Sequence, residues 1–118
     1  MKSILVADDM LPILDMFKVR LPKDYDVIIT STIKEAKRFC SSVQFDIVLT
    51  DIKFDSESEG GFELVRHLID INFLGKIGIM SGYLINIPDE LKDRIDFVLN
   101  KPFEISEFLK ILKKIKFL

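Results

Sequence analysis

The sequence predicts an α/β domain in three layers, with an open, doubly wound parallel sheet of five strands and five helices on its two faces. Five short apolar runs rich in β-branched residues are separated by segments with helical periodicity. The runs lack regular alternation with polar residues, which is typical of strands covered on both faces. Because crossovers between parallel strands are right-handed, this alternation of strand and helix leaves few other topologies.

The strands are predicted from apolar runs that are too short for a typical helix. In chain order they are residues 4–7, 27–29, 47–50, 77–80 and 97–99. Two adjacent aspartates, Asp8 and Asp9, follow the first run, and Asp51 follows the third. Acidic residues directly after strands that are built for burial need an explanation of their own.

The first two helices are predicted from apolar stripes and capping residues. Residues 11–21 tolerate Pro12 in the first turn and place four apolar residues on one side, namely Ile13, Leu14, Phe17 and Leu21. Thr32 and Glu35 form a capping box at the start of the second helix. The apolar stripe that follows this box consists of Ala36, Phe39, Cys40 and Val43.

Three more helices are predicted downstream. The glycines at 60–61 precede a helix whose apolar residues are Phe62, Val65, Leu68 and Ile69. A shorter helix is predicted for residues 88–94. The last helix has an apolar face of Ile105, Phe108, Leu109, Leu112 and Ile115, and its remaining surface carries Lys110, Lys113, Lys114 and Lys116. We interpret these lysines as a solvated face, with a docking surface for an acidic partner as the alternative.

Size and composition limit the range of functions. The 118 residues suffice for one domain, so we expect residues 1–118 to form a single domain with no output domain. The chain is 48% apolar and 31% charged, the balance of an ordinary globular protein. With 17 Lys and Arg against 19 Asp and Glu, the net charge of -2 provides no field for binding a phosphate backbone. Nucleic acid is therefore not expected as a direct partner.

The sequence also indicates a cytoplasmic protein without a membrane segment. Cys40 is the only cysteine, which excludes an internal disulfide framework and fits a reducing compartment. No apolar run approaches the roughly 20 residues needed to cross a bilayer, and the N-terminus meets acid too early for a signal peptide. We expect Cys40 to be a small core residue and His67 to lie on a solvated helix face.

Five polar residues follow the predicted strands and are candidates for one site: Asp8, Asp9, Asp51, Ser81 and Lys101. In an open parallel sheet, the functional crevice lies beyond the carboxyl ends of the strands, so these side chains are expected to converge. Three carboxylates this close together repel one another unless a cation lies among them. Oxygen ligands without histidine or thiolate select Mg²⁺ or a similar ion such as Mn²⁺ over zinc.

The same residues indicate phosphoryl chemistry. A carboxylate beside such an ion can attack phosphorus and form an aspartyl phosphate. Lys101 supplies a mobile positive charge, and Ser81 can hydrogen-bond a phosphoryl oxygen with no side chain at Gly82 to obstruct it. Pro102 makes the preceding peptide bond a candidate for the cis form, which would turn the lysine inward. The surrounding acids argue against a Ser-Lys hydrolase dyad.

Over essentially its full length, the chain resembles the receiver domains of two-component response regulators, through VADD at 6–9, IVLTD at 47–51, IMSG at 79–82 and NKPF at 100–103. The resemblance implies a flavodoxin-like sheet with strand order 2-1-3-4-5. It also implies that a histidine kinase or histidine phosphotransfer protein phosphorylates Asp51. The remaining implied roles are Mg²⁺ binding by Asp8, Asp9, Asp51 and the backbone carbonyl of Lys53, a hydroxyl switch at Ser81, and phosphate pairing by Lys101.

The implied protein is a signalling phosphoacceptor and not a metabolic enzyme, although it catalyses its own phosphoryl transfer and dephosphorylation. By the same resemblance, its state is read by a downstream protein through roughly residues 84–118. The alternatives for the whole chain are a free-standing module and a receiver cut from a longer protein.

The chain departs from the usual receiver pattern at several positions. Asp55 stands where the family usually has proline, and the loop over residues 54–61 is longer than usual. Val98 occupies the position of the aromatic switch, with Phe97 one residue earlier, which predicts an absent or altered coupling between the serine and an aromatic ring. The positions at which family members tune the phosphoryl lifetime are Lys53 and Tyr83.

Two other functions are weighed against the receiver. A Mg²⁺-dependent small-molecule phosphatase or phosphotransferase would use the same aspartyl phosphate, but such enzymes need a cap or substrate pocket, and this chain has little length for one. A flavodoxin-like flavin module would need uncharged, hydroxyl-rich loops after the first strand, where this chain has Asp8 and Asp9.

Overall fold

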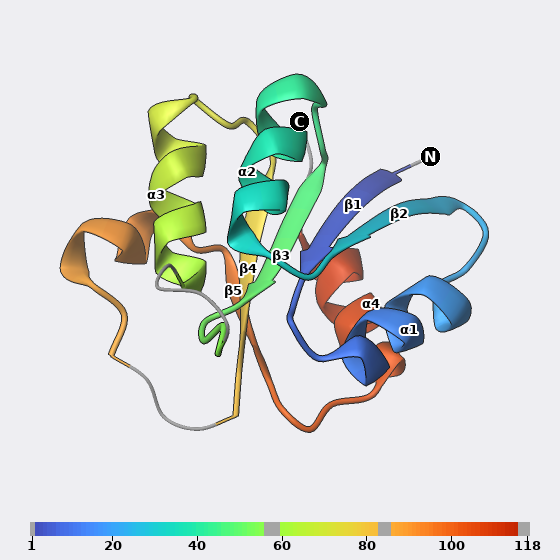
Figure 1. Ribbon diagram of the computed structural model, residues 1–118. Coiled ribbons are helices and arrows are strands. Elements are labelled where there is room, and N and C mark those ends of the chain that lie inside the picture. The colour runs from blue at the N-terminus through green and yellow to red at the C-terminus, as the bar shows by residue number, and fades with distance from the viewer. Residues whose placement is uncertain (1, 56–59, 83–85, 116–118) are drawn as a thin grey trace.

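The computed structural model describes residues 2–55, 60–82 and 86–115 (Figure 1). A single parallel sheet has the strand order β2-β1-β3-β4-β5. Its strands are β1 (Lys2–Ala7), β2 (Tyr25–Thr30), β3 (Ile47–Asp51), β4 (Lys76–Ser81) and β5 (Phe97–Asn100). The helices are α1 (Leu11–Arg20), α2 (Ile33–Ser42), α3 (Gly61–Asp70), the 3₁₀ helix η1 (Asp89–Arg94) and α4 (Ile105–Lys114). The predicted fold class and strand order are confirmed, and the described residues contain five helical segments, of which the fourth is a 3₁₀ helix.

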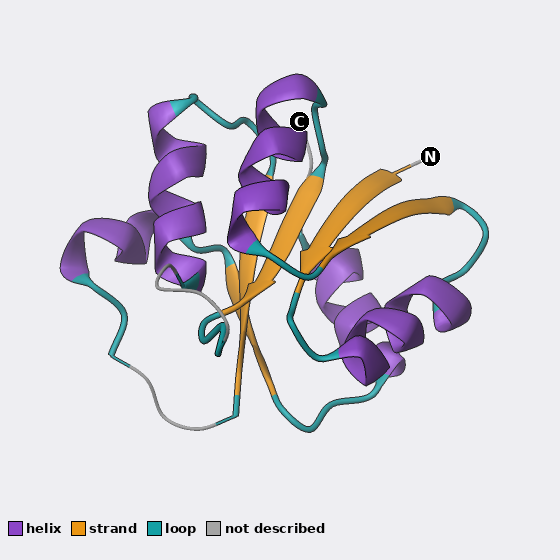
Figure 2. Ribbon diagram, viewed as in Figure 1, coloured by secondary structure: helices purple, strands orange, loops and turns teal. Residues whose placement is uncertain are grey.

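Helices cover both faces of the sheet (Figure 2). A hydrophobic cluster lies on each face, between the sheet and its helices. Successive residues of a strand point to opposite faces, so Leu5 and Ala7 of β1 belong to one cluster and Ile4 and Val6 to the other. The first cluster contains buried residues of α2, α3 and η1, and the second contains those of α1 and α4. This arrangement confirms the three layers.

The helix boundaries follow the predicted signals, except that three residues of the predicted apolar faces lie one residue beyond their helices, namely Leu21 after α1, Val43 after α2 and Ile115 after α4. The hydroxyl of Thr32 accepts a hydrogen bond from the backbone amide of Glu35 at 3.1 Å, so the predicted N-cap is present. Val43, which we placed on the apolar stripe of this helix, lies beyond its last residue and is 44% exposed. The helical period ends at Ser42, because Val43 has extended backbone angles that turn its side chain out of the stripe.

Phe97 of β5 is half-buried and packs against the hydrophobic cluster shared with α1 and α4. A Cβ atom added to Gly78 on the neighbouring strand would lie only 2.2 Å from the Phe97 ring, so the glycine provides the space that this ring occupies. The ring also packs against Phe108 of α4, with the two centroids 6.1 Å apart. Val98 points outward and is 38% exposed. An aliphatic side chain therefore stands on the surface at position 98, whereas the ring of Phe97, one residue earlier, packs against the hydrophobic cluster shared with α1 and α4.

Cys40 is buried, as predicted, and burial raises the pKa of its thiol to about 12. The thiol therefore stays neutral in the folded protein at pH 8, whereas an unfolded cysteine ionises near pH 8.5. We expect no reaction with a thiol reagent at pH 8 until the chain is unfolded in urea. Because the pKa is raised on folding, stability should fall as the pH rises above about 8.5. Rapid labelling of the folded protein would contradict this placement.

Two buried threonines differ in how their hydroxyl groups are bonded. Within the described part of the chain, the Thr30 hydroxyl has no hydrogen-bond partner, although the residue is 1% exposed. The Thr50 hydroxyl, equally buried, donates to the backbone carbonyl of Asp51 at 2.8 Å.

Replacing Thr30 with valine is therefore expected to leave stability unchanged or raise it by about 1 kcal/mol, because an unsatisfied polar group leaves the core. Thr50→Val is the matched control and should destabilise the protein by about 1 kcal/mol through loss of its hydrogen bond. Urea unfolding measures both changes. A Thr30→Val protein that is as unstable as Thr50→Val would show that the Thr30 hydroxyl is bonded.

Candidate functional site

The candidate site lies at the carboxyl edge of the sheet, in a pocket of about 260 Å³. Asp8 and Asp9 follow β1, Asp51 is the last residue of β3, Ser81 is the last residue of β4, and Lys101 follows β5. Asp9, Asp51, Ser81 and Lys101 all line the pocket. Because the strands are parallel, their carboxyl ends lie at the same edge of the sheet, and residues separated by up to 93 positions in the sequence meet there.

Three carboxylates form the acidic centre of this pocket. Ligand oxygens of Asp8, Asp9 and Asp51 all lie within 4.8 Å of one another. Asp8 is fully buried, so its charge is removed from water. Burial, and next the negative charge of Asp8, raise the pKa of Asp51 against the opposing effects of Lys101 and the Ile52 amide. The arrangement makes it unfavourable to ionise all three acids without a compensating cation.

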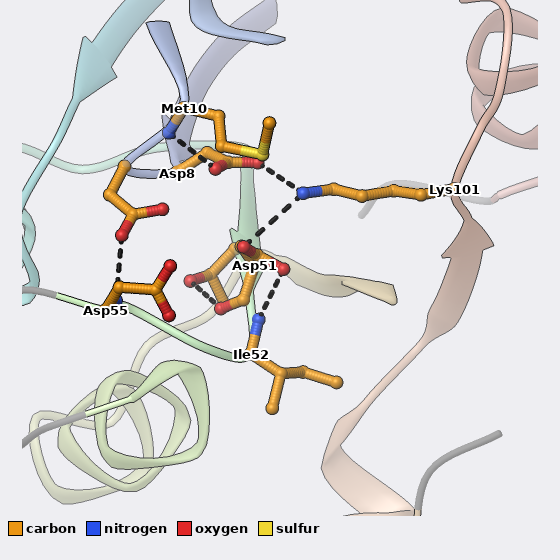
Figure 3. A network of polar contacts seen from close by, with 8 residues as sticks. Asp8, Met10, Asp51, Ile52, Asp55 and Lys101 are labelled. Atoms are coloured by element: carbon orange, nitrogen blue, oxygen red, sulfur yellow. Dashed lines mark hydrogen bonds and ion pairs between the residues drawn. The ribbon is translucent and has the colours of Figure 1, made fainter. Parts of the chain in front are cut away.

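Lys101 provides part of that compensation (Figure 3). Its Nζ atom lies 2.8 Å from Oδ2 of Asp8 and 3.4 Å from Oδ2 of Asp51. Burial opposes the charge on this ammonium, but the hydrogen bond and charge of Asp8, followed by Asp51, prevail and raise the pKa of Lys101. The Lys101–Pro102 peptide bond is cis, the form for which the sequence made it a candidate.

Backbone amides hold each of the three carboxylates. The amide of Met10 donates to Oδ1 of Asp8 at 2.9 Å, and that of Ile52 donates to Oδ1 of Asp51 at 2.9 Å. The amide of Asp55 donates to Oδ2 of Asp9 at 2.8 Å. These donors were not predicted, because a backbone amide is present at almost every position and side-chain identity does not show where it points.

The residues of the pocket fit a hard divalent cation such as Mg²⁺. One ammonium stands against three carboxylates, which leaves negative charge, and the side chains that converge here offer oxygen and no imidazole or thiolate. Lys53, whose carbonyl was predicted as a ligand, also lines the pocket. Asp8, Asp9 and Asp51 would hold the ion, and the carbonyl of Lys53 is the further ligand that the resemblance implies.

The remaining predicted residues divide between the pocket and other places. Ser81 is 4% exposed in the wall, and none of the residues that the structure describes comes within 4 Å of the position that a Cβ of Gly82 would take. Tyr83 lies outside the described residues. His67 is remote from the pocket on the last turn of α3, where its Nε2 atom lies 3.0 Å from the Ser41 hydroxyl. No imidazole among the described residues lines the site.

Sequence comparisons alone do not assign the chain. No protein-family model matches it. One curated protein, Protein SRG1 of Arabidopsis thaliana, is 34% identical over 94 residues, which are 80% of this chain and 25% of that protein. The chain thus spans about a quarter of the length of the curated relative that it matches.

Solved structures give a consistent picture. A CheY-like response regulator receiver domain protein from Methanospirillum hungatei is 28% identical, with a TM-score of 0.82 and coverage of 97% of this chain and 92% of that chain. A CheY-like receiver domain from Methylobacillus flagellatus is 23% identical, with a TM-score of 0.85 and coverage of 98% and 99%. Response regulator TrrA of Thermotoga maritima, solved with Mg²⁺ and BeF, is 24% identical, with a TM-score of 0.78 and coverage of 97% and 98%. The resemblance seen in the sequence motifs is thereby confirmed, and the chain has the CheY-like receiver-domain fold of the response regulators.

Proposed function

We propose that this chain is the phosphoacceptor receiver of a two-component or phosphorelay system, with Asp51 as the acceptor. The observation that carries the proposal is the meeting of Asp8, Asp9, Asp51 and Lys101 at one edge of a receiver fold. The donor would be a phosphohistidine on a histidine kinase or a histidine phosphotransfer protein. We also propose that residues 1–118 act as one receiver domain and that it works in the cytoplasm, where such donors are met.

In the proposed reaction, a carboxylate oxygen of Asp51 attacks phosphorus. The bond between phosphorus and the donor histidine nitrogen breaks as the new O–P bond forms, and the leaving nitrogen takes up a proton. Lys101 stands 3.4 Å from Oδ2 of Asp51, where its charge can offset that of the transferred phosphoryl oxygens. The amide of Ile52 holds the other oxygen of Asp51 and so orients the nucleophile. Ser81, in the wall of the same pocket, is placed to hydrogen-bond a phosphoryl oxygen.

The proposed cofactor is Mg²⁺, with Mn²⁺ as a substitute, held by Asp8, Asp9, Asp51 and the carbonyl of Lys53. A bound divalent ion would neutralise carboxylate charge and charge on the phosphoryl oxygens. The TrrA structure with Mg²⁺ and BeF supports this choice, because that protein has the same fold.

The proposed output is a change in the surface formed by roughly residues 84–118, of which 84–85 and 116–118 lie outside the described residues. Phosphorylation would shift a two-state equilibrium and alter how a downstream protein binds there. Val98 stands exposed on this surface, so the switch would not depend on an aromatic side chain at that position.

The proposal is tested by incubating the pure protein with Mg²⁺ and acetyl phosphate and measuring its intact mass. Wild type should gain one phosphoryl group and Asp51→Asn none. Asp70→Asn, on the exposed end of α3, is the matched control and should be labelled like wild type. Labelling of Asp51→Asn would overturn the proposal. Continuous turnover of many phosphate esters would favour the alternative, a Mg²⁺-dependent phosphatase or phosphotransferase.

A further inference from the structure

The three acids of the site differ in what holds them. Asp8 and Asp51 each accept one backbone amide and also contact Lys101. Among the described residues, Asp9 has no such ion pair, and the one hydrogen bond to its carboxylate comes from the amide of Asp55, at 2.8 Å. The orientation of Asp9 therefore depends on the segment that follows β3.

Described residues before and after Asp55 are fixed by contacts with the rest of the fold. Phe54, the preceding residue, is 4% exposed and belongs to the hydrophobic cluster shared with α2 and α3. The amide of Gly61, at the start of α3, donates to the carbonyl of Ile52 at 2.8 Å and ties this end of the helix to the end of β3. The buried side chain of Phe54 thus fixes the position from which the Asp55 amide donates to Asp9, while the Asp55 side chain is exposed at the rim of the pocket.

We propose that the backbone amide of Asp55 positions Asp9 for cation binding, so that the segment after β3 sets part of the metal affinity of this site. The inference rests on the proposed function, since it concerns the same Mg²⁺ site. A hydrogen bond to an ionised carboxylate is among the stronger protein hydrogen bonds, and it fixes the side-chain rotamer. A carboxylate has about four lone-pair positions, so one amide leaves Asp9 free to ligate a cation. Proline at position 55, the usual residue in receivers, has no N–H and could not make this contact.

Two substitutions at position 55 separate the amide from the side-chain charge. Asp55→Asn removes the charge and keeps the N–H donor, whereas Asp55→Pro removes both. Mg²⁺ affinity is measured by following amide chemical shifts during titration of each folded protein. Loss of a group that orients a metal ligand typically weakens affinity 10- to 100-fold, so we expect about a tenfold loss in Asp55→Pro. Asp55→Asn should lose at most about threefold, because its exposed charge is screened.

A second measurement shows whether the effect acts through Asp9. If it does, Asp55→Pro should have little further effect on Mg²⁺ affinity in an Asp9→Ala background. If Asp55→Pro weakens Mg²⁺ binding equally in the Asp9→Ala background, the effect comes from a distorted loop, and the inference is overturned. Equal losses in Asp55→Asn and Asp55→Pro would also overturn it, because the charge alone would then account for them.

Hydrogen exchange tests the contact without proline, and it remains decisive if Asp55→Pro does not fold. The Asp55 amide should exchange slowly in wild type and at least about tenfold faster in Asp9→Ala, since its acceptor is gone. Equal exchange in the two proteins overturns the inference. A wild type that shows no Mg²⁺-dependent shifts overturns the proposed function and this inference together. Mg²⁺ binding that is equal in wild type and Asp55→Pro overturns this inference alone.

Discussion

Gly61→Ala is expected to destabilise the protein by about 3 kcal/mol or more and to displace the candidate acceptor. A Cβ atom at Gly61 would lie 2.0 Å from the backbone carbonyl oxygen of Asp51 and 3.0 Å from the Cα of Ile52. Alanine ordinarily favours a helix over glycine by about 1 kcal/mol, but here the clash is with backbone and cannot be relieved by rotating a side chain. The strand end and the start of α3 must move apart, and the amide of Gly61 would lose its bond to Ile52.

Gly82→Ala is the matched control. It also introduces one methyl group beside the site, but no described residue lies within 4 Å of the new Cβ. Urea unfolding with EDTA should show a lower midpoint for Gly61→Ala and almost no change for Gly82→Ala. An unchanged midpoint for Gly61→Ala would mean that α3 does not pack against the end of β3 as closely as described.

The layers of this fold could be predicted because its hydrophobic patterns are local and strong. The predicted strands 4–7 and 47–50 lie within β1 and β3, whose central residues are buried on both faces. Where several neighbouring residues fit the helical period, the predicted apolar stripe of a helix was less complete. Leu64 of α3 is fully buried but was not among the residues of the predicted stripe, because its neighbours Phe62 and Val65 fit the helical period as well.

The side chains of the site could also be located, because each follows a recognisable strand. What could not be predicted is the contribution of the backbone. The donors from Met10, Ile52 and Asp55 depend on turns whose directions no residue type reveals. Likewise, the distance between α3 and β3 at Gly61 depends on tertiary packing, and the glycine alone indicates only that a side chain is absent.

Lys101→Met is expected to destabilise the metal-free protein by about 3 kcal/mol, because it leaves a buried carboxylate without its partner. Asp8 is fully buried, and the Lys101 side chain is 17% exposed, so solvent can replace little of the lost interaction. The same substitution should raise the affinity for Mg²⁺, since the ion no longer competes with an ammonium for Asp8 and Asp51. Adding Mg²⁺ should therefore recover more stability in the variant than in wild type.

Lys92→Met is the matched control, because it makes the same change in an ion pair of similar length. Lys92 lies 3.0 Å from Asp89, but these side chains are 60% and 94% exposed, and water readily solvates the aspartate that remains. In urea unfolding with EDTA, Lys101→Met should therefore lose more stability than Lys92→Met. In saturating Mg²⁺, Lys101→Met should also recover more stability than Lys92→Met. If the two variants had the same midpoint in EDTA, Lys101 would contribute no more than a surface charge. The repulsion between Asp8 and Asp51 would then have no compensation from Lys101, which the complete burial of Asp8 makes costly.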